Sequence, residues 1–406
     1  MRSVEEHLAA ILELVRPLPP YEQPILEALG LPICEDVVSG VDLPGFDNSA
    51  MDGYACRLDD VHDASRDTPV RLPVVGESAA GQTKAYALSP GQAVKIMTGA
   101  PLPAGADVVV PVEWTDGGRA SVTIVQAPDP RQHVRGRGED VRVGDTLLEE
   151  GTVLGPRQAA ILAAIGHSRV KARPRPRVVV ISTGSELREP GTELGFDSIY
   201  DANSFALAAA ARQADAIAYR VGIVSDDPQE LTDTLSDQLV RADLVVTSGG
   251  VSKGDYDVVK DVLGRLGTVE FTEVAMQPGK PQGFGTIGED ETPIFTLPGN
   301  PVSSYISFEV FVLPALRRMM GKLPYRRPLV QAVCGAGFGS PRGRKQFVRG
   351  NFAVTMHGAQ ASPVGGHGSH LIGSLALSNC LIVVPEDQTE VREGDLVDVM
   401  VLDRNF

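Results

Sequence analysis

Acidic side chains lie at three serine- or glycine-rich turns in the second half of the chain. They are Glu186 in STGSEL (182–187), Asp226 after AYRVGIV (218–224), and Asp255 in TSGGVSKGD (247–255). Taken singly, each acid is explained by helix capping, since carboxylates stabilise helix N-termini. Taken together, three carboxylates at one edge of a sheet repel one another unless a hard cation joins them, and oxygen ligands suit Mg²⁺. The acids therefore predict a magnesium site.

The same turns offer groups that bind phosphate oxygens. Main-chain amides and hydroxyls directly after a strand form an anion cradle. The residues in question are Thr183, Gly184, Ser248, Gly249 and Gly250. LPGNPVSS fixes a turn between Pro298 and Pro301 before a helix start, and Lys280 in QPGKP adds positive charge. Rigid turns alone would explain these segments too, but with the acids they indicate a phosphorylated ligand held through a divalent cation.

Charge narrows the class of ligand. The chain has 406 residues and a formal net charge of −15, which argues against nucleic acid or an anionic membrane as the partner. Such an acidic protein binds phosphate only with local cations, amides or a metal ion. A basic cluster is available at Arg342, Arg344, Lys345 and Arg349, although a solvated surface explains it equally well.

Cysteine usage and hydropathy place the chain in the cytoplasm. Its four cysteines contain no CxxC pair, so neither a disulfide framework nor a cysteine zinc site is expected. Glu5, Glu6 and Glu13 interrupt the N-terminal apolar stretch, which argues against a signal peptide. No apolar run approaches the ~18 residues needed to span a bilayer.

The elements that position these turns alternate between strand and helix. Apolar strands at 178–182, 218–224, 243–248 and 293–301 are interleaved with helices at 202–214, to about 241, to about 264, and at 302–320. This pattern is typical of a doubly wound parallel sheet covered on both faces. Ligands of such sheets bind beyond the carboxyl ends of the strands, where all these turns lie.

The remaining chain predicts three further parts. The first thirty residues are expected to be helical, although the helical apolar spacing ends at Pro17, Pro19 and Pro20. Pro156 opens another helix. The fold class is thus multidomain α/β plus β, with a β-rich insertion domain, a discontinuous connecting domain and a C-terminal β-barrel-like domain. The boundaries are 1–44 with 138–173 (connecting), 45–137 (β-rich), 174–325 (α/β) and 326–406 (C-terminal).

Nine ordered motifs together resemble one family over nearly the whole chain. They are FDNSAMDGYA, IMTGAPLPAGADVVV, RGED, STGSEL, DSIYDANS, TSGGVSKGDYD, QPGKP, LPGNPVSS and GGHGSH. The family is that of the molybdopterin molybdenumtransferases, which includes the E domain of gephyrin. The resemblance implies Mg²⁺-dependent insertion of molybdate into adenylylated molybdopterin with release of AMP, the final step of molybdenum cofactor biosynthesis.

The resemblance also assigns roles to residues. It implies that Glu186, Asp226 and Asp255 serve Mg²⁺ and the pterin phosphates, and that Lys280, Pro298 and Pro301 bind the pterin. It matches Arg349 and Ser369 to residues linked to molybdate. It adds Asp52 and Thr98 to the catalytic cleft and Asp140 of RGED to the binding residues, positions that turn chemistry alone does not single out.

The family implies a homodimer, with one subunit's β domain near the other's α/β domain, and contact with the molybdopterin adenylyltransferase. This sequence departs from many relatives where Glu273 and Gln277 replace lysines, which leaves more anion binding to Lys280. Two alternatives stay open. The chain could instead be the adenylyltransferase, which the extra β domains disfavour, or a non-catalytic cofactor-binding scaffold, which retention of the acids disfavours.

Overall fold

The computed structural model describes residues 1–81, 86–249, 258–356, 358–366, 368–403 and 406. They form two compact units. The α/β unit comprises residues 1–23, 27–34 and 170–406, and the insertion unit comprises residues 24–26 and 35–169. The predicted fold class is confirmed. The four predicted domains are finer than these two units, and their boundaries stay a prediction.

A six-stranded sheet forms the centre of the α/β unit, in the order β15-β12-β16-β20-β19-β17. The strands are β12 (Arg177–Thr183), β15 (Ile217–Val224), β16 (Leu244–Ser248), β17 (Glu270–Glu273), β19 (Pro281–Ile287) and β20 (Thr292–Leu297). The first four in that order are parallel, as predicted. The last two are antiparallel additions that the sequence did not predict as strands of this sheet.

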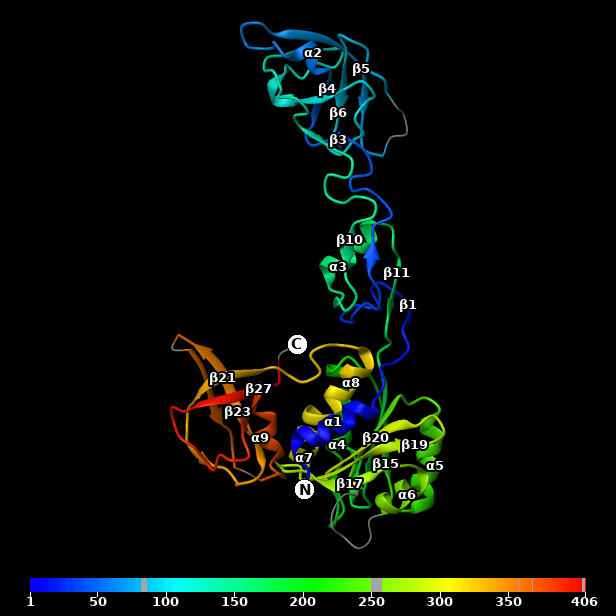
Figure 1. Cartoon of the computed structure of the whole chain (residues 1–406), viewed down its shortest axis with the longest axis vertical. Coiled ribbons are helices and arrows are strands. Elements are labelled where there is room, and N and C mark those ends of the chain that lie inside the picture. Colours follow the sequence, from blue (N-terminus) through cyan, green and yellow to red (C-terminus); the bar gives the residue numbers. More distant parts are fainter. Residues whose placement is uncertain (82–85, 250–257, 357, 367, 404–405) are drawn as a thin grey trace. The chain divides into compact units, whose positions relative to one another are not determined.

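Helices cover both faces of this sheet (Figure 1). Alternate residues of β12 point to opposite faces, so Val178 and Val180 pack in one core and Val179 and Ile181 in another. The first core includes α1 (Val4–Leu14), α4 (Asn203–Gln213), α7 (Pro301–Ser307), the π-helix η2 (Phe308–Val312) and α8 (Leu313–Met320). The second includes α5 (Pro228–Leu239) and α6 (Val258–Leu266). The sheet is therefore doubly wound.

The N-terminal segment is helical only in part. Ser3 and Glu6 form a capping box that starts α1, and the helix ends before Pro17. Residues Tyr21–Pro24 then form strand β1 followed by turns, so the prediction of helix over the first thirty residues is wrong beyond the prolines. The helical spacing of apolar residues that is seen in α1 does not continue beyond the prolines.

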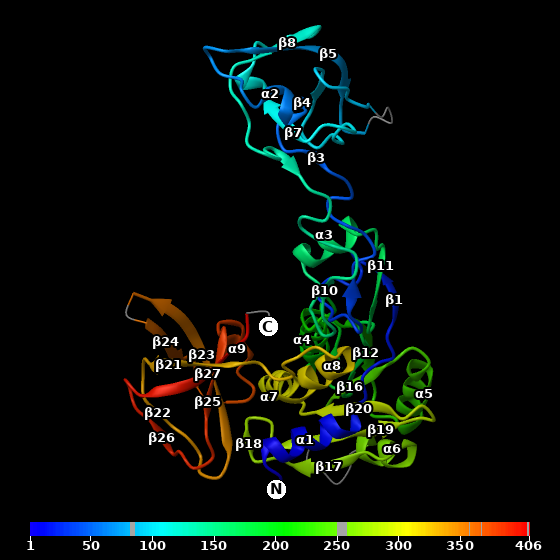
Figure 2. The same ribbon diagram turned by 45° about the horizontal axis from the view of Figure 1, so that its top comes forward.

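A closed β-barrel follows in the C-terminal part of the same unit (Figure 2). Its strands are β21 (Leu329–Cys334), β23 (Lys345–Thr355), β24 (Gly358–Pro363), β25 (Cys380–Val384) and β27 (Leu396–Val401). Closure arises because β23 pairs with both β24 and β25. The short strand β18 (Met276–Gln277) pairs with the start of β23 and so links the barrel to the central sheet. Helix α9 (Ile372–Ala376) precedes β25.

The insertion unit contains a five-stranded sheet in the order β7-β4-β6-β5-β8. Its strands are β4 (Gly53–Cys56), β5 (Val70–Ser78), β6 (Ala93–Ile96), β7 (Val108–Pro111) and β8 (Ser121–Ile124). Helix α3 (Pro156–Ala164) begins at Pro156, as predicted. Among the residues that the structure describes, no helix combines the length and the apolar character needed to cross a membrane.

Candidate active site

At the carboxyl ends of the parallel strands, the loops that follow two neighbouring strands, β12 and β16, lead to helices on opposite faces of the sheet. After β12 the chain passes to α4 on one face of the sheet, whereas the chain after β16 reaches α6 on the other. The order β15-β12-β16-β20 therefore puts the topological switch point between β12 and β16, where ligands of open α/β sheets bind. Two of the predicted turns, at 183–186 and 248–249, begin there.

Both turns at the switch point require glycine. Gly249 has φ +101°, and a Cβ on it would lie 2.8 Å from the Thr183 carbonyl oxygen. Gly184 has φ +150°, and a Cβ there would lie 2.6 Å from a Glu186 carboxylate oxygen. Only glycine allows this approach at these backbone angles. The structure thus brings together Thr183, Gly184, Ser248 and Gly249, four of the residues predicted to cradle phosphate.

Asp226 and Asp227 divide two tasks between them. The Asp227 carboxylate accepts the main-chain N–H groups of Gln229 and Glu230, both at 2.9 Å, and so caps α5. The Asp226 carboxylate instead contacts the turn after β12, where it accepts hydrogen bonds from the N–H of Ser185 at 3.0 Å and from the Ser185 hydroxyl at 2.8 Å. Helix capping therefore explains Asp227 and leaves Asp226 to the site.

Glu186 is not a helix cap, because residues Leu187–Arg188 form the short strand β13 and no helix follows directly. Its exposed carboxylate lies over the α-carbon of Gly184. Arg188, which the sequence analysis missed, donates to the Ser185 carbonyl at 2.8 Å and brings a cation to this turn. In the sequence, the position of Arg188 two residues after Glu186 is the feature that could have indicated a cation at this turn.

The two described acids of the predicted magnesium site have the chemistry for it. Glu186 and Asp226 present exposed carboxylates, hard oxygen donors of the kind Mg²⁺ prefers, and Asp226 is hydrogen-bonded to Ser185, the residue before Glu186. The third, Asp255, lies outside the described residues, as does Gly250 of the predicted cradle. Within the described part of the chain, no three His, Cys, Asp or Glu side chains are grouped as metal ligands would be.

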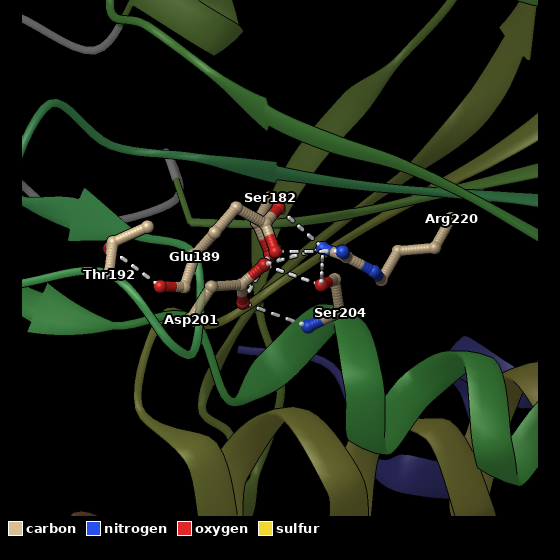
Figure 3. Close-up of polar contacts among 6 residues, drawn as sticks. All are labelled: Ser182, Glu189, Thr192, Asp201, Ser204 and Arg220. Carbon is tan, nitrogen blue, oxygen red and sulfur yellow. Dashed lines mark hydrogen bonds and ion pairs between the residues drawn. The ribbon is translucent and has the colours of Figure 1, made fainter.

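A buried network of polar side chains connects the ends of the strands that precede these turns (Figure 3). Asp201 is 1% exposed and accepts the Ser182 hydroxyl at 2.9 Å and the N–H of Ser204 at 3.0 Å. The Ser182 hydroxyl also lies 3.2 Å from that of Ser248, so one carboxylate ties the ends of β12 and β16 to the start of α4. Asp201 was not among the residues predicted from the sequence, although its place three residues before Ser204 is a capping signal.

An ion pair extends the network to β15. The Arg220 guanidinium donates to both carboxylate oxygens of Glu189 at 2.8 Å and lies 3.8 Å from Asp201. This bidentate contact holds the pKa of Glu189 below its usual value. The network is therefore charged and hydrogen-bonded on several sides, which fixes the strand ends that carry the phosphate-binding turns.

The turn at 298–301 joins the same edge. Asn203 donates its side-chain amide to the Gly299 carbonyl at 2.7 Å, and Pro301 is the first residue of α7, while Pro298 is buried. The N–H of Val302 donates to the carbonyl of Ser369 at 3.1 Å. Ser369 is thereby brought to the turn that contains Pro298 and Pro301, as the predicted site requires.

Arg349 is a buried cation beside a small cavity. It is 4% exposed, and burial lowers the pKa of its guanidinium. It donates to the main-chain carbonyls of Leu371, at 2.8 Å, and Gly366. A cavity of about 20 Å³ adjoins it, lined also by Pro278 and Val302, with room for one water-sized group. A desolvated guanidinium in such a place favours a small oxyanion. Lys345, another of the predicted basic residues, pairs instead with Glu5 and Glu386.

Lys280 lies at the same edge and is paired. Its ammonium is 2.9 Å from a carboxylate oxygen of Glu273. Both residues were noted in the sequence, but their contact was not predicted because it depends on strands β17 and β19 being neighbours.

In the insertion unit, Asp52 and Thr98 lie together. The Asp52 carboxylate accepts the N–H of Thr98 at 2.7 Å and its hydroxyl at 2.9 Å. These two bonds, the main-chain one foremost, hold the pKa of Asp52 below its ordinary value, so it is ionised at neutral pH. Both side chains are exposed, and so is Asp140, whose N–H donates to the Leu43 carbonyl at 3.0 Å.

A second, larger cavity lies at the opposite edge of the central sheet. Its volume is about 580 Å³, and it is lined by Arg177, Asp243 and Thr292, among others, where strands begin. Arg177 and Asp243 are already joined by an ion pair at 2.8 Å. The turns predicted to bind phosphate lie at the carboxyl edge instead.

Family models cover most of the chain. Residues 2–166 match the MoeA N-terminal region (domain I and II), residues 179–318 match a probable molybdopterin binding domain, and residues 331–402 match the MoeA C-terminal region (domain IV). All nine sequence motifs and both units contribute to these matches.

Curated relatives and solved structures agree. Molybdopterin molybdenumtransferase 2 of Mycobacterium tuberculosis is 47% identical over 98% of this chain and 99% of its own length. A molybdopterin molybdenumtransferase of Haemophilus influenzae is 36% identical over 90% of each chain. The crystal structure of a molybdopterin biosynthesis MoeA protein from Pyrococcus horikoshii has a TM-score of 0.84 at 33% identity and covers 99% of both chains.

Proposed function

Because this chain belongs to the MoeA family of molybdopterin molybdenumtransferases, we propose that it transfers molybdenum to molybdopterin in molybdenum cofactor biosynthesis. The substrates are adenylylated molybdopterin and molybdate. Water attacks the phosphoanhydride and AMP leaves. The two dithiolene sulfurs bind the molybdenum of molybdate, and one molybdate oxygen leaves as water with the two thiol protons. No protein thiol is needed, consistent with the burial of Cys56, Cys334 and Cys380.

The observation that carries this proposal is that Asp226 and Asp227, although adjacent, have different hydrogen-bond partners. Asp227 suffices to cap α5, yet Asp226 reaches across to the N–H and hydroxyl of Ser185 in the turn after β12. A carboxylate that organises a glycine-containing phosphate turn while remaining exposed suits a nucleotide site built around a cation. Glu186 and Asp226 would hold Mg²⁺, which would supply positive charge to neutralise the phosphates and polarise the scissile phosphorus.

The remaining residues position and screen the substrate. The turns that contain Gly184 and Gly249 and the start of α7 at Pro301 line the edge that receives the phosphates, and Lys280 adds charge there. The N–H groups of the two glycines themselves donate to the carbonyls of Val224 and Leu297, so these glycines shape the turns and do not bind the phosphates directly. Arg349 and Ser369, whose carbonyl accepts the N–H of Val302, are the residues assigned to molybdate. Catalysis in this scheme arises mainly from holding two anions together in one site.

Asp52 and Thr98 supply the second part of the active site. Their mutual hydrogen bonds fix an ionised carboxylate on an exposed loop of the insertion unit. In the proposed homodimer, this loop meets the α/β unit of the partner copy, and Asp140 contributes to binding. The protein acts in the cytoplasm and receives its substrate by contact with the molybdopterin adenylyltransferase.

The test compares two substrate pairs. The purified chain with Mg²⁺, adenylylated molybdopterin and molybdate is expected to release AMP and form the molybdenum cofactor, and omission of molybdate is expected to suppress cofactor formation. The same chain with molybdopterin and ATP is expected to form no adenylate. Adenylate synthesis instead would identify an adenylyltransferase, and stoichiometric binding without turnover would identify a scaffold.

A further inference from the structure

Strand directions place Lys280 and Glu273 at the active-site edge. Strand β20 runs toward this edge and ends at Leu297, immediately before Pro298. Strand β19 is antiparallel to it, with Gly283 opposite Thr296, so its first residues lie at that edge. Strand β17 returns beside β19 and ends there, with Glu273 opposite Pro281.

The main chain around Lys280 is held firmly, whereas its side chain is accessible. The carbonyl of Lys280 accepts the N–H of Val274 at 2.7 Å, and Gly279 before it has φ +97° with no room for a side chain. The side chains of Lys280 and Glu273 are 33% and 39% exposed. Their ion pair can therefore open into solvent without moving the backbone.

The other charges at this edge determine how strongly the Lys280–Glu273 pair affects the binding of an anionic ligand. Glu186 and Asp226 are exposed acids beside the phosphate-binding turns, so an anionic ligand depends on the cations that remain. The charge of Lys280 is compensated by Glu273 at 2.9 Å. A phosphate oxygen that approaches Lys280 must compete with a carboxylate of this same chain.

We propose that Glu273 is a positioning residue that acts through Lys280 as a built-in competitor of the anionic substrate. In the free protein Glu273 holds the ammonium, and a phosphate group displaces it on binding. When the anionic product leaves, the carboxylate recaptures Lys280. The pair thus lowers the affinity for any anionic ligand that binds Lys280, by the free energy needed to open the ion pair. This inference rests on the proposed function for its substrate.

The magnitude follows from the exposure of the pair. Ion pairs this open contribute about 1.5- to 5-fold to an equilibrium constant. Removing the competitor is therefore expected to tighten anion binding by that factor, and to steepen its salt dependence because one more uncompensated charge meets the ligand.

The experiment uses Glu273→Gln, Lys280→Gln and the double variant in the full chain. The control is Glu270→Gln, the same charge change on the same strand, where the carboxylate pairs with Arg2 at 2.9 Å. Calorimetry with inorganic pyrophosphate and with AMP measures dissociation constants at low and high salt. Steady-state assays measure KM and kcat for adenylylated molybdopterin, and thermal unfolding checks each variant's fold.

We expect Glu273→Gln to lower the pyrophosphate Kd and the substrate KM by about 1.5- to 5-fold, with kcat nearly unchanged. Glu270→Gln is expected to change neither constant. In the Lys280→Gln background the gain from Glu273→Gln is expected to fall by more than half. An equal gain with and without Lys280, or no gain at all, would overturn the proposal.

The two proposals fail separately. If wild-type protein shows no molybdate-dependent AMP release, the proposed function is wrong, while the pyrophosphate measurements still test Glu273. If wild-type protein is active and Glu273→Gln binds pyrophosphate no more tightly, only the role of Glu273 is wrong.

Discussion

Replacing Asp226 by Asn tests the central contact of the site. The carboxylate accepts two hydrogen bonds from Ser185, at 3.0 Å from the N–H and 2.8 Å from the hydroxyl. Hydrogen bonds to a charged group contribute about 1.5–3 kcal/mol, and neutral ones about 1 kcal/mol. An amide oxygen keeps the geometry but not the charge, so the turn loses about 2 kcal/mol. We expect kcat/KM to fall roughly 30-fold or more, since a cation ligand is lost as well.

Asp227→Asn is the matched control for this prediction. It removes the same charge one residue away, but Asn caps a helix about as well as Asp does. We expect its kcat/KM to stay within about twofold of wild type, because Asp227 serves only α5. The assay is Mg²⁺-dependent release of AMP from adenylylated molybdopterin, with thermal unfolding as the check on folding. Equal activity of the two variants would refute the division of roles.

The remaining predictions concern the cradle and the core. Gly249→Ala is expected to cost about 2 kcal/mol of unfolding free energy and to weaken AMP binding, because its φ of +101° and the Thr183 carbonyl exclude a Cβ. Gly264→Ala, within α6 and with open space around it, is expected to stabilise the fold slightly; equal losses in both would contradict the argument. Burial lowers the pKa of His7 from 6.5 to about 4, so the unfolded chain takes up the proton first. Denaturant titrations from pH 6.5 down to 4 are thus expected to show a loss of about 3 kcal/mol that His7→Leu abolishes, and an unchanged loss in that variant would exclude His7 as the cause.

Much of the α/β unit could be predicted because its strands are nearly continuous runs of β-branched residues. Val178–Ile181 and Leu244–Val246 are buried on both faces, which is the condition that makes such runs visible in a sequence. The carboxyl-edge location of Glu186 and Asp226 followed from strand direction alone. These inferences depend on local pattern, and the structure bears them out.

Contacts between distant segments could not be predicted. Asp226 and Asp227 suit a helix start equally well in sequence, and only the position of Ser185, 41 residues earlier, separates their roles. The pairing of Glu273 with Lys280 needs two antiparallel strands that carry glycines and polar residues instead of an apolar run. The burial of Arg349 likewise depends on barrel closure, which no local pattern announces.

A crystal structure of the full chain with AMP and Mg²⁺ tests the central claim most directly. We expect the AMP phosphate at the turns that contain Gly184, Gly249 and Pro301, with one cation about 2.1 Å from carboxylate oxygens of both Glu186 and Asp226. Nucleotide bound instead in the cavity at the opposite edge, beside Arg177, or a cation that contacts neither acid, would contradict the account.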